Sequence, residues 1–319
     1  MSHEPSAPAS GSAIEAWHLG RALATQAETM DAAGVRQGFV AAADGALAPV
    51  PAGDPHAAVT WEPGQGWTLA PEAAAAMPLA DLSLPVCSAT ARAPITLGHM
   101  GQSLDGFIAT HTGDSQFVTG EENLRHMHRL RAICDAVIVG AGTVAADDPR
   151  LTTRHVAGPN PLRVVIDPMA RLVANYRVFQ DAEAPTLYVY VRRYVSGVPP
   201  VPGHVETFAV GDGPHGPDLA ELVAMLRARG CARLFVEGGG VTVSAFLAAG
   251  LLDRVQVAVA PMFIGGGRPA FRLPAANMLR DVARPAYRVF RMGGDVLFDC
   301  DLRGAAGDAS ASDTIARVI

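Results

Sequence analysis

The residue types and spacing best suited to chemistry lie around Glu237. This acid follows the apolar residues 234–236 and precedes three glycines, and a segment of helical character opens at Thr242 and stops at Gly250. The pattern predicts a strand, a bare turn and a helix N-terminus, where glycines let an anion approach free backbone N–H groups. Open α/β sheets place ligand-binding groups at the carboxyl ends of their strands, and Glu237 is expected at such an end. On this stretch alone, a purely structural connection is an equal alternative.

A second glycine turn lies upstream, after the apolar run 136–140. Residues 140–145 match G-x-G-x-x-A, and Asp167 ends the next apolar run, which is the outline of a dinucleotide-binding fingerprint. Pro149 stops the segment a few residues after Thr143, whereas a Rossmann crossover needs a full helix there. The sequence therefore favours a short helical turn whose N–H groups and Thr143 hydroxyl meet a phosphate.

An arginine lies on the apolar face of the helix expected between these elements. Residues 119–122 read T-G-E-E, which predicts a capping box with Thr119 as N-cap and Glu122 reaching back. An arginine among apolar residues either extends its guanidinium to solvent along the protein surface, which is commoner, or is buried and binds an anion. The residues expected to share this face are Leu124, Met127, Arg131 and Cys134.

Composition limits the classes of function. The chain has 319 residues, 49% of them hydrophobic, and its net charge of −6 gives no basic footprint for nucleic acid. All 25 basic residues are arginine, which excludes mechanisms that need a lysine. The four cysteines are scattered without metal-ligand spacing, so reduced thiols in a cytoplasmic protein and no metal site are expected. No segment resembles a signal peptide or a membrane span.

The chain is expected to divide into three parts. Residues 1–93 form an N-terminal extension of unknown role, with 1–12 disordered, a helix over 14–30, short strands over 35–42 and 57–61, and little periodicity from 62 to 93. It lacks the paired H-x-E and P-C-x-x-C motifs of zinc deaminases. Residues 94–302 alternate strands with helices and end in a hairpin around Gly293-Gly294, which predicts one α/β domain with a mostly parallel sheet and an antiparallel edge. Residues 303–319 read as a loose tail.

Taken together, these motifs resemble the pyrimidine reductase domain of bacterial riboflavin-pathway enzymes, in the dihydrofolate-reductase-like superfamily. The resemblance covers residues 94 to about 302, and the order and spacing of its motifs make it specific. The matching segments are 103–106 (SLDG), 113–120, 128–131, 140–152, Arg154, 161–167, 237–239 and 260–261.

The resemblance implies a three-layer fold with a mixed, mostly parallel sheet. It implies NADPH-dependent reduction of the ribosyl group of 5-amino-6-(5-phosphoribosylamino)uracil to ribityl, in the cytoplasm and by a homodimer. The partner would be a small phosphorylated aminopyrimidine, with no metal required. The protein would orient both reactants and supply a proton.

Site residues follow from the same resemblance. Arg131 and Arg154 would bind the substrate phosphate as two cationic forks, and Glu237 would hydrogen-bond the substrate and serve catalysis. The substrate-binding residues implied are Ser115, Arg131, Leu151, Arg154 and Glu237. The cofactor-binding residues implied are Gly101, Phe117, Thr143, Asp147, Gly239, Gly240, Val241, Thr242, Val243, Ser244 and Ala245. Asp105 is expected to stabilise the SLDG turn rather than do chemistry.

Two departures from the family pattern concern the site. A lysine usual at or near His99 or Met100 is missing, so His99 either substitutes for it or is a surface histidine. Pro168 follows Asp167 where the family frequently has serine, which removes one cofactor contact. Alternatives are therefore a same-fold reductase of a pteridine or other heterocycle, and a non-catalytic nucleotide-binding module. Arg192 and Arg193 are candidate readers of a cofactor 2′-phosphate.

Overall fold

The computed structural model describes residues 11–304, except 43, 117, 198 and 215, and two compact units divide between Pro94 and Ile95. The predictions for Phe117, for disorder over 1–10 and for the tail beyond 304 lie outside the described residues. Among the described residues, no helix combines the length and apolar character needed to cross a membrane.

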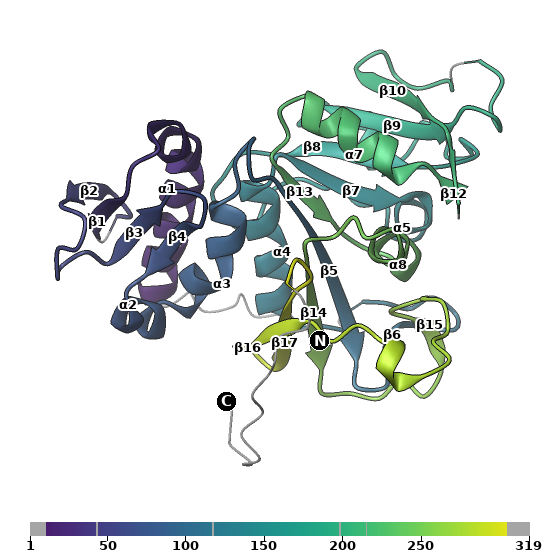
Figure 1. Ribbon diagram of the computed structural model, residues 1–319. Helices are drawn as coiled ribbons and strands as arrows, with labels where there is room; N and C mark the ends of the chain where they lie inside the picture. Colours follow the sequence, from purple (N-terminus) through teal and green to yellow (C-terminus); the bar gives the residue numbers. More distant parts are fainter. Residues whose placement is uncertain (1–10, 43, 117, 198, 215, 305–319) are drawn as a thin grey trace. The chain divides into compact units, whose positions relative to one another are not determined.

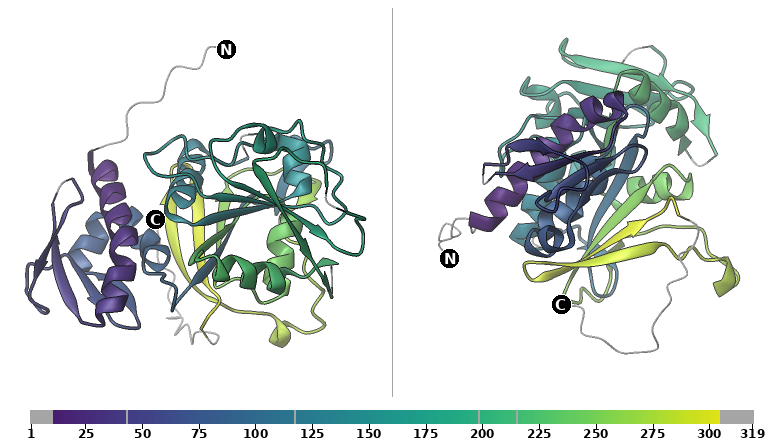
Figure 2. Two further views of the ribbon diagram at one scale, coloured as in Figure 1. Left: turned by 90° about the horizontal axis from the view of Figure 1, so that it is seen from above. Right: turned by 60° about the vertical axis from the view of Figure 1, so that its left-hand side comes forward.

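The first unit is a four-stranded antiparallel sheet with one long helix on its face (Figure 2). Its core is aromatic: Trp61 and Trp67 pack edge to face at 4.9 Å, and the Trp67 Nε1–H donates to the Leu23 carbonyl of the helix at 3.1 Å. In chain order the elements are α1 (Gly11–Ala33), β1 (Gln37–Ala41), β2 (Leu47–Val50), β3 (Val59–Glu62), β4 (Gly66–Leu69), α2 (Pro71–Ala76) and α3 (Pro78–Cys87), with strand order β2-β1-β3-β4.

One prediction for this unit was wrong. Disorder was expected through residue 12, but α1 begins at Gly11. The stretch 62–93 showed little periodicity in the sequence, and its elements β4, α2 and α3 were not predicted. Both helices begin with a proline, and they contain only 6 and 10 residues. Helices this short span too few turns to show a clear hydrophobic periodicity in the sequence.

The second unit is built on a nine-stranded sheet, in the order β10-β9-β8-β7-β13-β5-β14-β17-β16 (Figure 1). All neighbours from β10 to β14 run parallel, and β17 and β16 form an antiparallel hairpin at one edge. The strands are β5 (Ile95–Ser103), β7 (Ala136–Gly140), β8 (Leu162–Ile166), β9 (Thr186–Val191), β10 (Val205–Val210), β13 (Arg233–Val236), β14 (Arg254–Ala260), β16 (Ala286–Met292) and β17 (Asp295–Asp301).

Helices cover both faces of this sheet. The apolar cluster on one face joins Ile138 and Val236 of the strands to Phe246 of α8 and Leu222 of α7. The helices are α4 (Glu121–Ile133), α5 (Ala141–Asp147), α6 (Arg177–Gln180), α7 (Leu219–Ala228), α8 (Gly240–Ala248) and the 3-10 turn η1 (Leu279–Asp281), and the small ladders are β6 (Phe107–Thr110) with β15 (Gly267–Pro269) and β11 (Asp212–Gly213) with β12 (Gly216–Pro217). The predicted three-layer fold with an antiparallel edge hairpin is confirmed.

Strand order reverses beside β13. After β7 the chain builds β8, β9 and β10 outward on one side, then returns through α7 to insert β13 between β7 and β5. Open α/β sheets bind ligands at the carboxyl ends of strands where such a reversal occurs. A ligand-binding site is therefore expected at the carboxyl ends of β7, β13 and β5.

The start of α4 differs from the predicted capping box. Its N-cap is Gly120, whose N–H donates to Asp295 Oδ2 of the hairpin at 2.7 Å. Thr119 Oγ1 instead accepts from the Asn123 amide at 2.9 Å, and Glu122 pairs with Arg129 at 2.6 Å. A carboxylate distant in sequence supplies the cap, and no local motif could have shown it.

The predicted apolar face of α4 was also wrong. Leu124 is 44% exposed, whereas Asn123, His126 and Arg131 are buried against the sheet. The helix buries polar groups because the strands opposite supply partners, for example Gln256 Oε1, 2.8 Å from His126 Nε2. Arg131 is thus a buried arginine and not a snorkelling one.

Candidate active site

Arg131 and Glu237 form a buried ion pair at the carboxyl end of β13. Arg131 Nε donates to Glu237 Oε2 at 2.8 Å, and a second guanidinium nitrogen donates to Oε1, so the pair is bidentate. Both side chains are only 6% exposed. The third nitrogen of Arg131 donates to the Thr152 carbonyl at 3.2 Å. Fork-to-fork geometry of this kind is strong and directional, so each side chain orients the other.

The loop that follows α5 brings two further predicted substrate residues to this pair. Leu151 is fully buried at φ 57°, a left-handed conformation that is uncommon for a non-glycine residue. Arg154 reaches only the Thr152 hydroxyl, at 3.4 Å, and no carboxylate partner is found for it among the described residues. Burial, then the like charges of Arg131 and Arg150, lower the Arg154 pKa below its ordinary value. A bound anion would relieve that repulsion.

The two glycine turns lie side by side (Figure 1). The Gly239 N–H donates to Thr143 Oγ1 at 3.0 Å, which joins the start of α8 to α5. A Cβ at Gly140 would lie 2.3 Å from Thr242 Oγ1, and one at Gly238, where φ is 84°, would lie 3.0 Å from Thr143 Oγ1. Neither position admits a larger residue without displacement. Among the described residues no N-cap side chain closes α8; the N–H of its N-cap Gly239 donates to Thr143, and the N–H of Thr242 donates to the Gly239 carbonyl at 3.0 Å.

The segment 239–245 does not present all its side chains in one direction. Val241 is 60% exposed beside the turn, and Thr242 packs against Gly140. Val243 belongs to the apolar core, and Ser244 Oγ accepts from the backbone N–H of Arg272 at 2.8 Å. A Cβ at Gly240 would meet the Ala270 carbonyl at 2.4 Å, so Gly240 admits the neighbouring backbone. Ala245 is half-buried, one turn into the helix.

Ser115 and Asp147 lie beside each other, with Asp147 at the end of α5. The Ser115 hydroxyl is 3.5 Å from Asp147 Oδ1. Desolvation raises the Asp147 pKa, opposed by the Ser115 hydrogen bond and the charge of Arg268, with Glu237 adding to the rise. Arg268 of β15 is a charged neighbour that the sequence analysis missed, because nothing in the run PMFIGGGRPAF indicates that it folds back toward α5.

Gly101 lies three residues beyond the point where β5 pairs with Val236. A Cβ there would meet Thr119 Cγ2 at 2.8 Å, so the glycine lets the segment before α4 approach the strand. Gly101, Thr143 and Glu237 thus occupy the ends of β5, β7 and β13 or the turns that follow them. Most of the described candidate residues therefore lie at the carboxyl ends of these strands, but the Val243 side chain lies in the apolar core and Ser244 is bonded to the Arg272 backbone.

His99 is neither a surface residue nor a group that titrates near neutrality. It is 3% exposed, packed beneath α4 with its ring 5.9 Å from that of His126. Burial, then the charge of His126, lower the His99 pKa to about 3 despite a hydrogen bond with Asn123. The imidazole is therefore neutral at physiological pH. The expectation of a surface histidine was wrong.

Asp105 stabilises the turn as predicted. Its carboxylate accepts from Ser103 Oγ at 2.5 Å and from the backbone N–H groups of Ile264 at 3.1 Å and Gly265 at 2.7 Å. The Ser103 hydrogen bond, with those from the Gly265 and Ile264 backbone, holds the Asp105 pKa at about 2. The residue joins the turn after β5 to the segment after β14, which leads to Arg268.

The structure is a three-layer α/β fold with its candidate site at the carboxyl ends of β5, β7 and β13, and comparison with known proteins shows the family. The family model "RibD C-terminal domain" matches residues 95–285, so the chain belongs to the RibD C-terminal domain family. It is 38% identical over 220 residues to the 2,5-diamino-6-ribosylamino-4(3H)-pyrimidinone 5′-phosphate reductase of Methanothermobacter thermautotrophicus, covering 66% of this chain and 99% of that protein. The predicted family and reductase class are confirmed.

Longer relatives match over part of their length. The chain is 32% identical to the riboflavin biosynthesis protein RibD of Aquifex aeolicus, covering 61% of this chain and 54% of that protein. Among solved structures it is similar to a deaminase/5-amino-6-(5-phosphoribosylamino)uracil reductase of Thermotoga maritima, with TM-score 0.58 and 27% identity, covering 72% of this chain and 61% of that one. A likeness to Acinetobacter baumannii RibD, at 20% identity and TM-score 0.57, concerns the fold alone.

Proposed function

We propose that this chain reduces the ribosyl group of a phosphorylated ribosylaminopyrimidine to ribityl, with NADPH as the reductant. The observation that carries the proposal is the Arg131–Glu237 pair, with Arg154 beside it and the glycine turns next to it. A buried carboxylate, an arginine to which the described residues offer no carboxylate partner, and a helix N-terminus between two glycine turns suit a polar phosphorylated substrate and a dinucleotide.

On the substrate side, Arg154 is the phosphate-binding fork. Arg131 was expected to bind the phosphate as well, but in this conformation its nitrogens donate to Glu237 and to the Thr152 carbonyl. Arg131 holds the carboxylate of Glu237 in one orientation, so that Glu237 can accept from N–H or O–H groups of the substrate. Leu151 was also expected to contact the substrate, but its side chain is fully buried in this conformation and supports the loop instead.

On the cofactor side, the first turn of α8 and Thr143 suit a pyrophosphate. The described residues fit this group because a Cβ at Gly142, at the start of α5, would meet no atom within 4 Å and because none of their side chains caps α8. Bound reduced nicotinamide would supply hydride to the ring-opened sugar carbon. The protein's part is to hold the two reactants in reacting orientation at the ends of β5, β7 and β13 and to keep water out.

The identity of the pyrimidine is the finer question. The archaeal relative that matches over its whole length is a reductase of the 2,5-diaminopyrimidinone phosphate, whereas the Thermotoga relative acts on the deaminated uracil. The higher identity to the first of these, 38% against 27%, favours the diaminopyrimidinone as the substrate over the uracil expected from the sequence. The two molecules differ only at ring position 2.

The test is to supply each aminopyrimidine phosphate with NADPH and to follow the loss of nicotinamide absorbance. We expect turnover of at least one of the two, with a kcat/KM preference for the diaminopyrimidinone. Absence of turnover with either, together with tight NADPH binding, would support a non-catalytic nucleotide-binding module instead. Turnover of a non-phosphorylated pterin that is unaffected by Arg154→Ala would support the pteridine alternative.

Arg192 and Arg193 provide little support for NADPH over NADH. Arg192 pairs with Glu221 at 3.3 Å and Arg193 with Asp212 at 3.1 Å, so both guanidinium groups already have carboxylate partners. Their pairs are exposed, however, and exposed pairs are weak enough for a cofactor phosphate to compete. If Arg192→Ala leaves the ratio of kcat/KM for NADPH and NADH unchanged, that residue has no part in the choice.

A further inference from the structure

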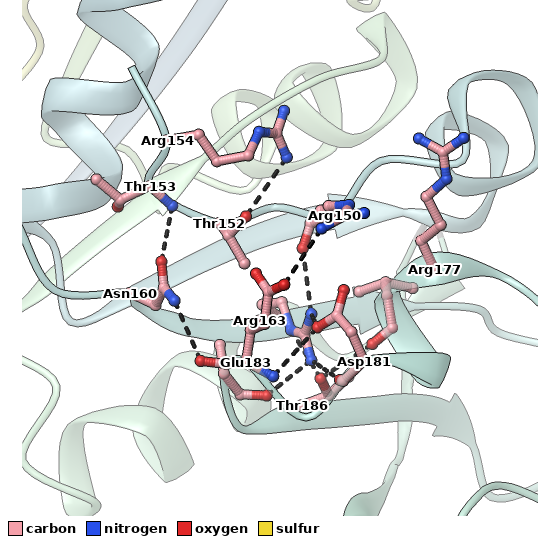
Figure 3. A network of polar contacts seen from close by, with 12 residues as sticks. Arg150, Thr152, Thr153, Arg154, Asn160, Arg163, Arg177, Asp181, Glu183 and Thr186 are labelled. Carbon is pink, nitrogen blue, oxygen red and sulfur yellow. Dashed lines mark hydrogen bonds and ion pairs between the residues drawn. The ribbon is translucent and has the colours of Figure 1, made fainter. Parts of the chain in front are cut away.

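Arg163 is a fully buried arginine that the mechanism above does not use. It lies on β8, and all three nitrogens of its guanidinium donate hydrogen bonds (Figure 3). Its acceptors are Thr186 Oγ1 at 2.9 Å, Asp181 Oδ1 at 2.5 Å, and the carbonyl oxygens of Arg150 at 3.2 Å, Asp181 at 2.8 Å and Ala184 at 2.7 Å.

These acceptors belong to two separate segments. Those at 181–186 lie between α6 and the first residue of β9, while the Arg150 carbonyl begins the loop that contains Leu151 and Arg154. Figure 3 shows Arg163 between the two segments, with the Arg154 side chain extending on the other side of the loop. Arg163 therefore ties the start of the substrate loop to the sheet.

The rest of the loop, residues 151–154, is also held by side chains from other parts of the fold. Leu151 is in a left-handed conformation, which persists only where the surroundings determine it. The backbone groups of the next three residues are each bonded to a side chain from outside the loop: the Thr152 carbonyl accepts from Arg131 at 3.2 Å, the Thr153 N–H donates to Asn160 at 2.8 Å, and the Arg154 N–H donates to His128 Nδ1 at 3.0 Å.

We propose that Arg163 is a positioning residue for substrate binding, which acts through the Arg150 carbonyl to hold residues 150–154 so that Arg154 meets the substrate phosphate. It does not touch the substrate, because its side chain is fully buried. The proposal rests on the proposed function for the role of Arg154. A misplacement of about 1 Å in such a group is enough to weaken binding substantially.

A purely structural role makes different predictions. A buried arginine that only stabilises the fold would lower the midpoint of thermal unfolding when replaced, and would leave the KM of the folded fraction unchanged. Arg254 offers a matched control, since it is also a buried arginine on a strand, with Asp299 and Asp301 as its partners. Neither Arg254 nor its partners belong to the candidate site.

The experiment compares Arg163→Met with Arg254→Met in the full chain. We expect Arg163→Met to raise the KM for the aminopyrimidine phosphate about tenfold, with kcat within about threefold and KM for NADPH unchanged. Arg254→Met should lower the unfolding midpoint but leave both KM values unchanged. A double variant with Arg154→Ala adds the decisive readout: once Arg154 is absent, Arg163→Met should have no further effect on KM.

Hydrogen exchange tests the same proposal without any activity. The amides of Thr153 and Arg154 should exchange about tenfold faster in Arg163→Met than in the wild type, and at the wild-type rate in Arg254→Met. An unchanged exchange rate at these amides would overturn the proposal, as would KM effects that multiply fully with those of Arg154→Ala. Failure of the proposed function is distinct, because it appears as an inactive wild type with the exchange difference intact.

If Arg163→Met does not fold, Arg163→Lys serves in its place. The lysine keeps the positive charge beside Asp181, but one ammonium group cannot reach acceptors on both segments in the geometry of the fork. We expect a smaller rise in KM of about threefold, with the same loss of effect in the Arg154→Ala background. Wild-type KM and wild-type exchange in Arg163→Lys would contradict the positioning role.

Discussion

Two buried arginine–carboxylate groups of the second unit, one around Arg254 and one formed by Arg131 and Glu237, have the same chemistry but lie in different surroundings. Arg254 of β14 donates to Asp299 at 2.7 Å and to Asp301 at 2.7 Å, both on the neighbouring strand β17. Asp299 also accepts from Arg288 of β16 at 2.8 Å and from Gln256 at 3.3 Å. All members lie on three consecutive strands of one antiparallel edge, so this group holds the register of the hairpin against β14.

The Arg131–Glu237 pair instead joins a helix to the end of a strand. Its neighbours are not further strands but an irregular loop at 150–154 and the glycine turns, and Arg154 nearby has no carboxylate partner among the described residues. Removing one partner of a buried pair is costly in either place. From these locations we expect the Arg254 group, which lies within a ladder, to be structural, and the Arg131–Glu237 pair, which lies at the carboxyl end of β13 beside the glycine turns, to take part in the proposed binding.

The largest effect expected from this comparison is that of Glu237→Gln. The amide keeps the shape of the carboxylate but leaves Arg131 without a counter-charge and presents a weaker acceptor to the substrate. We expect kcat/KM to fall about 10³-fold, which is about 4 kcal/mol of transition-state stabilisation, on steady-state measurement. Activity within about threefold of the wild type would reduce Glu237 to the end of a strand.

Asp299→Asn should affect stability and not activity. It leaves Arg254 and Arg288 without their shared carboxylate, so we expect the free energy of unfolding to fall by about 3 kcal/mol in denaturant titrations. The kcat/KM of the folded enzyme should stay within about threefold. A loss of activity comparable to that of Glu237→Gln would break the distinction between the two groups.

Arg154→Ala is expected to change binding by a smaller amount. Loss of one charge-assisted contact to the phosphate should raise the substrate KM about 30-fold, or about 2 kcal/mol, with little change in kcat. The unfolding free energy should hardly move, because Arg154 has no carboxylate partner to leave unpaired among the described residues. An unchanged KM would show that the phosphate binds elsewhere.

The smallest effect concerns acid stability. Burial of Asp299 opposes its ionisation, but hydrogen bonds and charges from Arg254 and Arg288 outweigh burial and lower its pKa below the ordinary 3.8. A lowered carboxyl pKa contributes stability above the unfolded value, and that stability is lost as pH falls through the folded value. The gap in unfolding free energy between wild type and Asp299→Asn should therefore narrow below pH 3.8. A gap that stays constant into acid would contradict this.

Much of the second unit could be predicted from local pattern. The apolar run 136–140 predicted β7 with the bounds that the structure has, and Gly293-Gly294 marked the hairpin between β16 and β17. The glycine turn after β13 and the short helix ended by Pro149 were also visible. These features are local: a buried strand needs a continuous apolar run, and a tight turn needs a residue that tolerates positive φ.

Local pattern failed where polar groups are buried with distant partners. The face of α4 was misassigned because apolar spacing cannot show that His126 meets Gln256 or that Arg131 meets Glu237, more than a hundred residues away. A surface position was one of the two alternatives given for His99, and it was wrong for the same reason. Arg268 gave no signal at all.

The sequence by itself determined the alternation of strands and helices, the turns, and the family to which they belong. Only the tertiary structure decided which charges are paired and which, such as Arg154, find no carboxylate partner among the described residues. The physical reason is that burial of a charge is tolerated only with a partner, and the partners of Arg131, Arg163 and Arg254 come from other elements of the fold.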